Sequence, residues 1–483
     1  MTNRLGRHPG AARATACLLL ALCLGASTLP AAAEQVMASS AAASPGAAGI
    51  GDPYFPLDGN GGIDVRRYQV HDRYSFGSGR LSGHTRLTIR ATQALSRFNL
   101  DLLLPVRGVR IAGRPVEFRK PNRHELQITP RRPIAAGTVF RVRVSYAGRP
   151  GTIGWRGERN WLADDTEVVT MNEPHMAPWW FPANDHPRDR ARMDIHITVP
   201  RRERVVANGQ QVSRRVHGRL ATTHWRAEEP MVPYLAFFAA GRFEVGQGSH
   251  RGLPWYVAVS KRIPQPTRDR SMRLMKRTPG VVSWLEGRLG EYPFASTGGL
   301  TTSLNPGFAL ENQTRPTYPV LARGSSSIVV HELAHQWLGD AVALHGWRDI
   351  WLNEGSASFL EVAYDEAHGG PTAQAWLDDR YADLDDDPTF WQLKIGDPGP
   401  SHLFDHEVYL RGAMAMQALR NRIGEEDFWT LLRTWVSERA GSTGSTGQFR
   451  RLAEKISGEE LDGFFEAWLI APVAPERTAD NGL

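Results

Sequence analysis

The spacing of His331, His335 and Glu354 constrains the fold more than any other feature of this chain. His331-Glu332-Leu333-Ala334-His335 is an H-E-x-x-H motif, and residues four apart lie on one face of an α-helix. Both imidazoles can therefore point at the same spot. With Glu354 they would supply two nitrogens and one carboxylate oxygen, the donor set of a catalytic zinc site that keeps a fourth position for water. Glu332 lies beside these ligands without being one, as a general base for that water must.

The alternative is an amphipathic helix in which two histidines fall four positions apart by chance. The chain has 16 histidines in 483 residues, so the motif should arise by chance in only about a few per cent of such chains. Ile328-Val329-Val330, Ala334 and Leu338 also make this a buried helix, as a zinc helix must be. We therefore predict one zinc ion per chain.

Several segments resemble the gluzincin aminopeptidases, the family of membrane alanyl aminopeptidase and leukotriene hydrolase. That family carries H-E-x-x-H, eighteen further residues and then a Glu in W-x-N-E-G, which matches Trp351-Leu352-Asn353-Glu354-Gly355. Phe308-Ala309-Leu310-Glu311-Asn312 is similar to its G-A-M-E-N segment, and Tyr409-Leu410-Arg411-Gly412-Ala413 to its Y-x-K-G-A segment. The segments Asn172-Glu173-Pro174 and Phe181 to Pro187 are similar to its Q-x-E-P and F-P-x-x-D-x-P stretch. The likeness runs from about residue 52 to the last residues of the chain.

The resemblance implies a role for each matched residue. His331, His335 and Glu354 would be the zinc ligands, and Glu332 the base. Glu311, with Ala309, Asn312 and less surely Glu173, would bind the free amino terminus of a peptide. Tyr409 would stabilise the tetrahedral intermediate. Without the resemblance, Tyr409 reads as an ordinary tyrosine at a helix start, and Glu173 could equally be a surface carboxylate.

The sequence departs from the family pattern at four of these places. Phe308 replaces the first Gly of G-A-M-E-N, Leu310 its Met, Arg411 the usual Lys, and Met171 the Gln of Q-x-E-P. Phe308 is bulkier than Gly and has less backbone freedom, so we expect it to affect substrate preference. The chain ends about 129 residues after Glu354, where the family usually continues into a large helical domain, and we expect functions of that domain to be absent.

These observations predict an exported zinc metalloaminopeptidase that hydrolyses N-terminal residues from peptides. Two alternatives stay open: a thermolysin-type zinc endopeptidase, which needs the same H-E-x-x-H set, and a non-enzymatic binding protein with a vestigial zinc site. The preferred N-terminal residue, the physiological substrate and the oligomeric state do not follow from the sequence.

Residues 1–33 have the composition of a secretory signal peptide. Three arginines precede an apolar run, and Ala31-Ala32-Ala33 offers a cleavage site before Glu34. An N-terminal membrane anchor is the alternative, but the run is short for a transmembrane span. Both cysteines, Cys17 and Cys23, lie in this segment, which excludes disulfides and thiolate ligands from the mature chain. We predict a secreted enzyme without stable membrane insertion after cleavage.

The net charge of +6 falls to +3 once the three arginines of residues 1–33 are removed. Basic residues are spread along the chain and accompany no nucleic-acid motif, so we expect no nucleic-acid partner.

Hydropathy patterns divide the mature chain into three parts. Residues 34–51 are rich in Ala, Ser and Gly and are predicted to be a flexible tail. Residues 52–250 show period-two runs, such as Phe140, Val142, Val144 and Tyr146, and predict an antiparallel β sandwich or saddle. Residues 251–483 predict a thermolysin-like, mainly helical catalytic domain, with helices at 271–289, around His331, and at 372–384, 408–423, 427–439, 447–457 and 459–469. The fold class is α+β multidomain.

Overall fold

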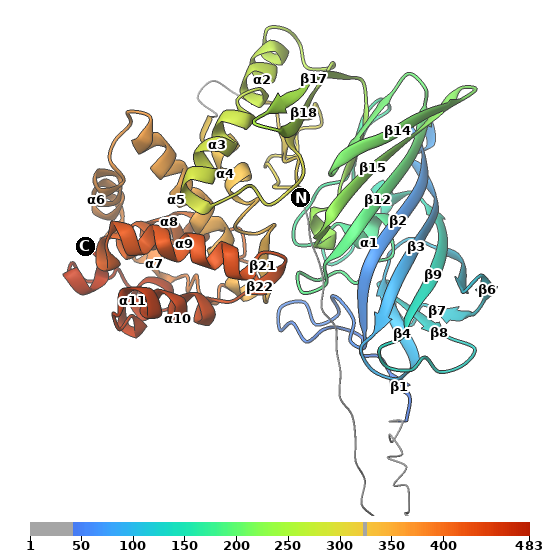
Figure 1. Ribbon diagram of the computed structural model, residues 1–483, viewed down its shortest axis with the longest axis horizontal. Helices are drawn as coiled ribbons and strands as arrows, with labels where there is room; N and C mark the ends of the chain where they lie inside the picture. The colour runs from blue at the N-terminus through green and yellow to red at the C-terminus, as the bar shows by residue number, and fades with distance from the viewer. Residues whose placement is uncertain (1–41, 322–325) are drawn as a thin grey trace, which may run out of the picture. The chain divides into compact units, whose positions relative to one another are not determined.

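The computed structural model describes residues 42–321 and 326–483, and the chain from Ala42 onward forms one compact unit (Figure 1). Residues 1–33, the predicted signal peptide, lie outside the described residues. A β-rich half, blue to green in Figure 1, precedes a mainly helical half in yellow to red. This order confirms the predicted fold class.

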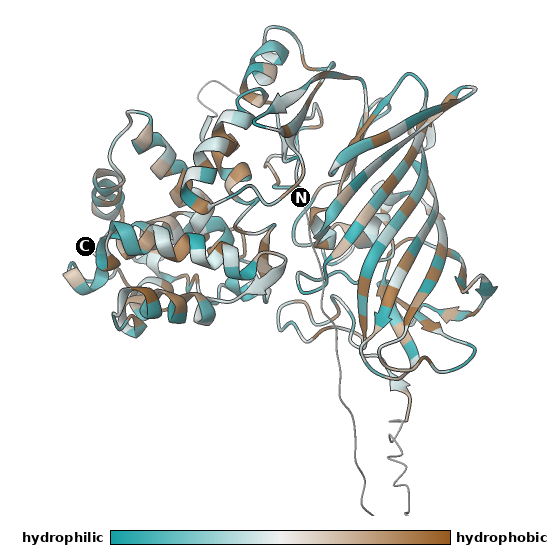
Figure 2. Ribbon diagram, viewed as in Figure 1, coloured by the Kyte–Doolittle hydropathy of each residue, from teal (hydrophilic) through white to brown (hydrophobic). Residues whose placement is uncertain are grey.

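An eight-stranded sheet in the order β14-β15-β12-β2-β3-β9-β5-β6 dominates the β-rich half. Its strands are β2 (Ile63–Ser75), β3 (Arg80–Ala91), β5 (Val106–Ile111), β6 (Arg114–Pro115), β9 (Val139–Gly148), β12 (Ala191–Pro200), β14 (Gln210–His217) and β15 (Leu220–Met231). Neighbours pair antiparallel, except that β2 and β12 pair in parallel. The predicted alternation is confirmed: in β9, Val142, Val144 and Tyr146 are buried while Arg141 and Arg143 are exposed. Figure 2 shows this banding along the strands.

Two four-stranded sheets complete the β-rich half. One has the order β1-β4-β8-β7 and the other β10-β11-β16-β13. Their strands are β1 (Ser44–Pro45), β4 (Leu95–Asp101), β7 (Glu117–Arg119), β8 (Glu125–Thr129), β10 (Leu162–Ala163), β11 (Val168–Val169), β13 (Arg204–Ala207) and β16 (Phe238–Gly241). A short helix, α1 (Ala177–Trp180), lies between β11 and β12 in the chain and is fully buried.

The described part of the predicted flexible tail, residues 42–51, is tied to the fold, which corrects that prediction. Ser44–Pro45 pairs in parallel with β4, and the Gly46 amide donates to the Arg97 carbonyl at 2.8 Å. These contacts join backbone atoms, so an Ala, Ser and Gly composition does not reveal them. Residues 34–41 lie outside the described residues.

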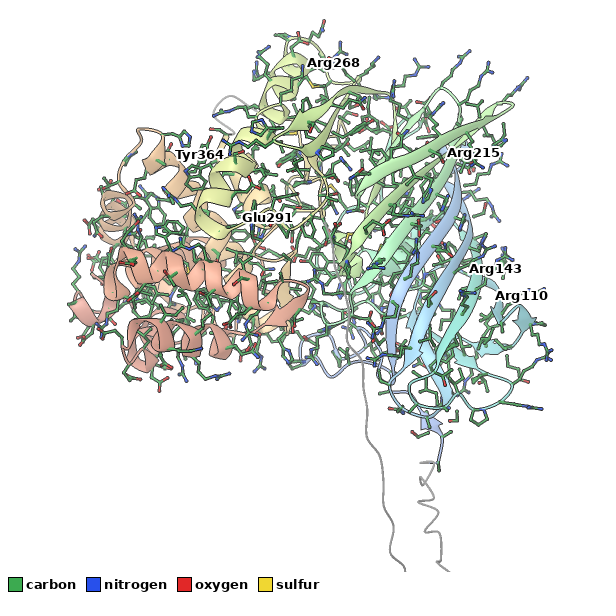
Figure 3. The ribbon with its side chains drawn as sticks, viewed as in Figure 1. Arg110, Arg143, Arg215, Arg268, Glu291 and Tyr364 are labelled. Atoms are coloured by element: carbon green, nitrogen blue, oxygen red, sulfur yellow. The ribbon has the colours of Figure 1, made fainter. Side chains whose placement is uncertain are left out.

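Arginines are spread over the large sheet and the first helices, as the sequence predicted. Arg110 lies on β5, Arg143 on β9 and Arg215 on β14, and Arg268 lies at the start of the helical half (Figure 3). All except Arg268 are exposed. This distribution is that of a solvated basic surface.

The sheet of the helical half begins before the predicted boundary at residue 250. It has the order β17-β18-β19-β20, with strands β17 (Phe243–His250), β18 (Leu253–Ser260), β19 (Thr297–Thr301) and β20 (Thr317–Tyr318). β17 pairs along its whole length with β18, so it belongs with the second half. β21 (Val342–Leu344) and β22 (Ser442–Gly444) form a separate parallel pair.

Ten helices of the second half match most of the predicted ranges. They are α2 (Thr267–Met275), α3 (Thr278–Leu289), α4 (Ser326–Ala334), α5 (Trp351–Ala367), α6 (Ala373–Leu384), α7 (Pro388–Gln392), α8 (His406–Ile423), α9 (Glu425–Arg439), α10 (Thr446–Ser457) and α11 (Asp462–Leu469). The predicted helix at 271–289 is two helices, because Pro279 fits the first turn of a helix but disrupts an interior. In α11, Phe464, Phe465 and Trp468, which the sequence spaces along one face of a helix, are all buried.

Helices α5 and α8 approach each other through two glycines. A Cβ built on Gly355 would lie 2.7 Å from the Cα of Gly412, so neither position accepts a side chain without movement of a helix. Gly355 directly follows Glu354, and Tyr409 lies one turn before Gly412. The contact therefore fixes these two side chains on facing helices.

Arg411 explains one departure from the family pattern. Its guanidinium is buried and donates to the carbonyls of Trp391, Leu393, Ala467, Trp468 and Ala471, at 2.7–3.2 Å. Five donors in a planar group reach carbonyls near the ends of α7 and α11 at once, which a lysine ammonium cannot do. Arg411 thus anchors α8, the helix that carries Tyr409.

Arginine side chains of the β-rich half also donate to backbone carbonyls of the helical half within the compact unit. Arg190 donates to the carbonyl oxygens of Asp340 and Ala341, and Arg188 donates to that of His345 at 2.6 Å. The residues that carry these carbonyls come soon after the H-E-x-x-H motif in the sequence. Within the described ranges, the structure contains no helix long and apolar enough to cross a membrane.

Candidate active site

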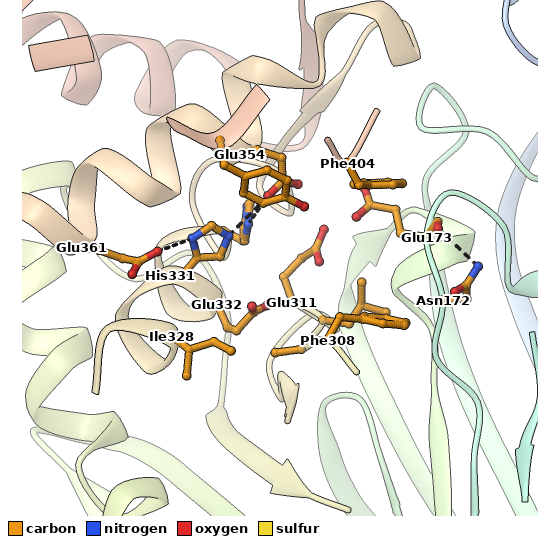
Figure 4. A pocket seen from close by; sticks show the side chains of 14 residues that line it. Asn172, Glu173, Phe308, Glu311, Ile328, His331, Glu332, Glu354, Glu361 and Phe404 are labelled. Atoms are coloured by element: carbon orange, nitrogen blue, oxygen red, sulfur yellow. Dashed lines mark hydrogen bonds and ion pairs between the residues drawn. The ribbon is translucent and has the colours of Figure 1, made fainter. Parts of the chain in front are cut away.

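The predicted zinc ligands meet at one buried point. His331 and His335 come from the end of α4, where the His335 amide still donates to the His331 carbonyl at 3.2 Å and so continues the helical turn. Glu354 comes from the first turn of α5. Its Oε2 lies 3.3 Å from His331 Nε2 and 3.4 Å from His335 Nε2 (Figure 4). The sequence prediction that these three side chains converge is correct in geometry.

These distances fit zinc. Donors held about 2.0–2.1 Å from a tetrahedral ion lie about 3.3 Å from each other. All three ligand atoms lie within 4.8 Å of one another, and all three side chains are buried. Two imidazole nitrogens and one carboxylate oxygen suit zinc, and thiolate is not needed. The donor set and its spacing therefore match a catalytic zinc centre.

A second layer of hydrogen bonds orients both imidazoles. His331 Nδ1 lies 2.7 Å from Glu361 Oε1, and His335 Nδ1 lies 3.1 Å from the Leu338 carbonyl oxygen. These contacts place a proton on Nδ1 and leave Nε2 free to bind a metal. Burial would lower the pKa of His331, but the hydrogen bonds with Glu354 and Glu361 outweigh it and raise that pKa. Glu361 was not identified from the sequence, although its position two turns after Glu354 on the same helix could have indicated a side chain near the zinc ligands.

Glu332 lies beside the ligands and lines the same cavity. The carboxylate is buried, and burial raises its pKa to about 8. It follows His331 in the sequence, and its side chain extends from the same helix toward the cavity (Figure 4). A basic carboxylate in this place can accept and return a proton.

Two further carboxylates lie at the cavity wall: Glu311 is buried, and Glu173 is half-buried with its Oε1 atom shielded from solvent. Burial raises the pKa of Glu173 well above its usual range, and the nearby charges of Glu311 and Glu354 raise it further. Tyr234 donates its hydroxyl to Glu311 Oε1 at 3.2 Å, and Gln336 donates to the Glu311 carbonyl at 2.9 Å. Tyr234 was not identified from the sequence, because it comes from a distant loop and lies in no recognised motif.

The remaining predicted residues divide into those that line the cavity and one that does not. Ala309 and Tyr409 line it, and the Tyr409 ring lies 5.9 Å from that of His331, nearly parallel to it. Asn312 does not line the cavity, in contrast to the predicted substrate contact. It is fully buried, and its amide donates to the Leu235 carbonyl at 3.1 Å. Its position suits a role in holding the Glu311 loop.

The cavity has a volume of about 650 Å³ and an apolar mouth. Phe308 and Phe404 are 42% and 39% exposed, and Ile328 is a further apolar lining residue, on the His331 side of the cavity (Figure 4). The described lining residues are Asn172, Glu173, Phe308, Ala309, Leu310, Glu311, Ile328, His331, Glu332, His335, Glu354, Glu361, Phe404 and Tyr409. Neither lysine nor arginine is among them. In this loop Gly307 has the positive φ (86°), and Phe308 does not, so its backbone is free of the strain that a positive φ causes in a non-glycine residue.

Comparisons with known proteins agree with this geometry. Residues 304–468 match the peptidase family M1 domain, and residues 67–235 match the peptidase M1 N-terminal domain. The chain is 26% identical to a glutamyl aminopeptidase from Bos taurus over 65% of this chain and 35% of the relative. It is 27% identical to aminopeptidase M1-B from Oryza sativa subsp. japonica over 62% of this chain and 36% of the relative. This chain thus spans less than half the length of the curated relatives that it matches.

A solved structure matches along its whole length. It is an M1 zinc metallopeptidase from Deinococcus radiodurans, crystallised as a mutant bound to a Tyr-Ser-Ala substrate. It shares 27% identity and a TM-score of 0.78, covering 89% of this chain and all of that one. A two-domain M1 zinc metallopeptidase mutant bound to L-tryptophan gives 28% identity and a TM-score of 0.79 over the same share of this chain. On the family matches, the zinc-like donor set and the shared architecture, this chain belongs to peptidase family M1, a family of zinc metallopeptidases.

Proposed function

We propose that this chain is a zinc aminopeptidase that removes N-terminal residues from peptides. One observation carries the proposal: the carboxylates of the buried Glu311 and the half-buried Glu173 line the same cavity as His331, His335 and Glu354. A peptidase that cleaved inside a chain would bind uncharged backbone at this place. Two carboxylates at one end of the cavity suit a ligand that ends there in a positive charge.

The substrate ammonium would satisfy these two carboxylates. Burying a carboxylate without a counter-charge is costly, and neither lysine nor arginine lines the described cavity. An ammonium between Glu173 and Glu311 would lower the pKa of both and keep them ionised. The hydroxyl of Tyr234 donates to the Glu311 carboxylate and helps to hold it in place. The cavity therefore selects free amino termini.

The chain's own residues would then carry the reaction. Zinc, when bound, acts as a Lewis acid that activates water and polarises the carbonyl of the scissile peptide bond. Glu332 accepts the proton of the attacking water and passes it to the leaving amine. Tyr409 donates its hydroxyl to the oxygen on which negative charge develops. Burial raises the pKa of Tyr409 well above its usual range, so the hydroxyl keeps its proton for this purpose.

Apolar first residues should be preferred. Their side chains would project from the ammonium site toward Phe308 and Phe404, which form an apolar wall. An acidic side chain would meet no cation among the described lining residues, so the preference should differ from that named for the glutamyl aminopeptidase relatives. Filling this wall with an apolar side chain contributes about 1.5–3 kcal/mol of binding free energy.

Hydrolysis of a panel of aminoacyl 4-nitroanilides tests both the preference for apolar first residues and the dependence on zinc. Leucyl, phenylalanyl and methionyl substrates should be cleaved with higher kcat/KM than glutamyl or aspartyl substrates. Phe308→Gly should broaden the range, because a glycine there removes the side chain from the wall. Chelation should abolish all cleavage and zinc should restore it. Equal rates for glutamyl and leucyl substrates would refute the apolar preference, and activity that survives chelation would refute the zinc mechanism.

We also propose that the enzyme is exported. Support comes from residues 1–33, with their arginines, apolar run and Ala31-Ala32-Ala33, and from a mature sequence free of cysteine. N-terminal sequencing of protein recovered outside the cell should begin at or near Glu34. A chain that keeps Arg4, or that carries lipid on Cys23, would contradict free secretion.

A further inference from the structure

A second group of metal donors lies in the β-rich half, away from the zinc motif in sequence. Asp101 ends β4, Glu125 begins β8, and His124 precedes Glu125. His124 Nδ1 lies 3.3 Å from Glu125 Oε1 and 3.8 Å from Asp101 Oδ1. The three ligand atoms lie within 4.8 Å of one another, and the three residues are only 0–1% exposed. The distance from His124 Nδ1 to Glu125 Oε1 equals the 3.3 Å between His331 Nε2 and Glu354 Oε2.

Neighbouring groups hold these carboxylates in place. Asn99 donates to Glu125 Oε2 at 3.0 Å, which leaves Oε1 directed at His124. The amides of Gly59 and Asp185 donate to Asp101 Oδ2 at 3.1 and 2.7 Å, which leaves Oδ1 on the His124 side. Such outer contacts are what orients the ligands of a metal site.

The surroundings are short of positive charge. Asp58, Asp101, Glu125 and Asp185 are all buried here. The cationic groups near them are Lys120, which donates to the Leu102 carbonyl, and His175, whose Nε2 lies 2.5 Å from Asp58 and whose Nδ1 lies 2.9 Å from Glu158. Buried carboxylates of this density require protons or a cation.

Two buried oxygens at this cluster have no hydrogen-bond partner among the described residues. They are Oδ2 of Asp185 and Oδ1 of Asn60. Both residues donate hydrogen bonds to the Asp101 carboxylate, Asp185 from its backbone amide and Asn60 from Nδ2 at 2.8 Å. A buried acceptor without a donor costs about 1–3 kcal/mol, and a bound cation would remove that cost.

We propose that Asp101, His124 and Glu125 bind a structural zinc ion in the β-rich half of the chain. An imidazole nitrogen beside two carboxylate oxygens favours a transition metal over calcium, which prefers oxygen donors alone. Asn60 and the Asp185 amide support the site by donating hydrogen bonds to Asp101. The ion would balance the charge of the cluster and be bound as the chain folds.

The cluster also adjoins the segment that presents Glu173. His175 lies two residues after Glu173, and its carbonyl accepts from Asn160 at 2.6 Å, while its ring is held by Asp58 and Glu158. An ion that stabilises this cluster would therefore stabilise the wall behind the amino-terminus site. The role is structural, because all three donor side chains are buried.

Another group of donors, Asp194, His196 and His224, provides the matched control. Its ligand atoms are also within 4.8 Å of one another. Asp194, however, already accepts from Arg67, Arg226 and His224. Its charge is balanced by protein, so we expect no metal there.

Metal content measured by mass spectrometry on the purified full-length protein tests the proposal. After gel filtration in metal-free buffer, the wild type should carry about two zinc ions per chain. A His331→Ala/His335→Ala variant should keep about one ion, and adding Glu125→Gln should remove it. His224→Gln should retain both. One ion in the wild type, or two ions in Glu125→Gln, would overturn the assignment.

Thermal stability is a second, independent test, because the expected change in Tm on Glu125→Gln differs between a zinc-bound cluster and a protonated one. If zinc is bound, Glu125→Gln removes a ligand and Tm should fall, and dipicolinate should lower the Tm of His331→Ala/His335→Ala but not that of the triple variant. If the cluster holds only protons, Glu125→Gln replaces a carboxyl group that is already neutral, and Tm should stay level or rise. A rise in Tm with unchanged metal content would refute the site even where the aminopeptidase activity is intact.

Discussion

Glu311→Gln is the change that examines the amino-terminus site most closely. Glutamine keeps the size of the side chain and can still accept from Tyr234, which lies 3.2 Å from Glu311 Oε1. It removes the negative charge that the substrate ammonium would meet. The Gln336 contact to the Glu311 carbonyl is a backbone contact and should survive.

The magnitude follows from the burial of this carboxylate. Two opposite charges about 3–4 Å apart attract by about 4–5 kcal/mol at an effective dielectric constant of about 20. Desolvation offsets part of this, and removal of one partner of a buried charged pair costs about 2–5 kcal/mol. Glu173 remains to hold the ammonium, so we expect the lower part of that range, about 2–3 kcal/mol. This corresponds to a loss in kcat/KM of about 30- to 150-fold.

Steady-state kinetics on leucyl 4-nitroanilide measures this loss, with zinc content determined on the same samples. Glu291→Gln, which removes an exposed charge far from the cavity lining, should leave kcat/KM unchanged. Wild-type kcat/KM in Glu311→Gln would refute the ammonium site. Loss of zinc along with activity would show that Glu311 supports the metal and not the substrate.

Three further substitutions separate the roles of the other site residues. Glu332→Gln should keep zinc bound while kcat falls by about 10²-fold or more, and loss of metal would contradict a role as base. Tyr409→Phe keeps the ring beside His331 and removes only the hydroxyl, so kcat should fall by about 10²-fold with little change in KM; a change in KM alone would argue against oxyanion stabilisation. Glu361→Gln should weaken zinc affinity by about 10- to 100-fold in a chelator competition, and unchanged affinity would exclude it as the group that orients His331.

The parts of the site that lie close together in sequence could be predicted, because helical geometry alone relates them. His331 and His335 lie one turn apart, so their convergence follows from the 3.6-residue period, and Glu332 is placed beside them by its position in the sequence. Glu354 required the resemblance to a known family. Tyr234 and Glu361 were not predicted, since each acts through a tertiary contact that no local pattern encodes.

The fold followed the same division. Alternation along strands such as β9 and the apolar stripe of α11 were readable, because each has a fixed period. The parallel pairing of β2 with β12 and the anchoring of residues 44–46 on β4 depend on backbone contacts between distant segments. The role of Arg411 is similar. The sequence shows an arginine where lysine is usual, but only the structure shows the carbonyls that it joins.

Cleavage of matched peptides with free and acetylated amino termini decides between an aminopeptidase and an endopeptidase. A leucine-initiated peptide of about ten residues, incubated with the purified zinc-loaded enzyme and followed by mass spectrometry, should lose residues singly from its N-terminus. Its acetylated counterpart has no ammonium for Glu173 and Glu311 and should remain intact over the same period. Internal cleavage of the acetylated peptide at a rate comparable to that of the free peptide would contradict the aminopeptidase function.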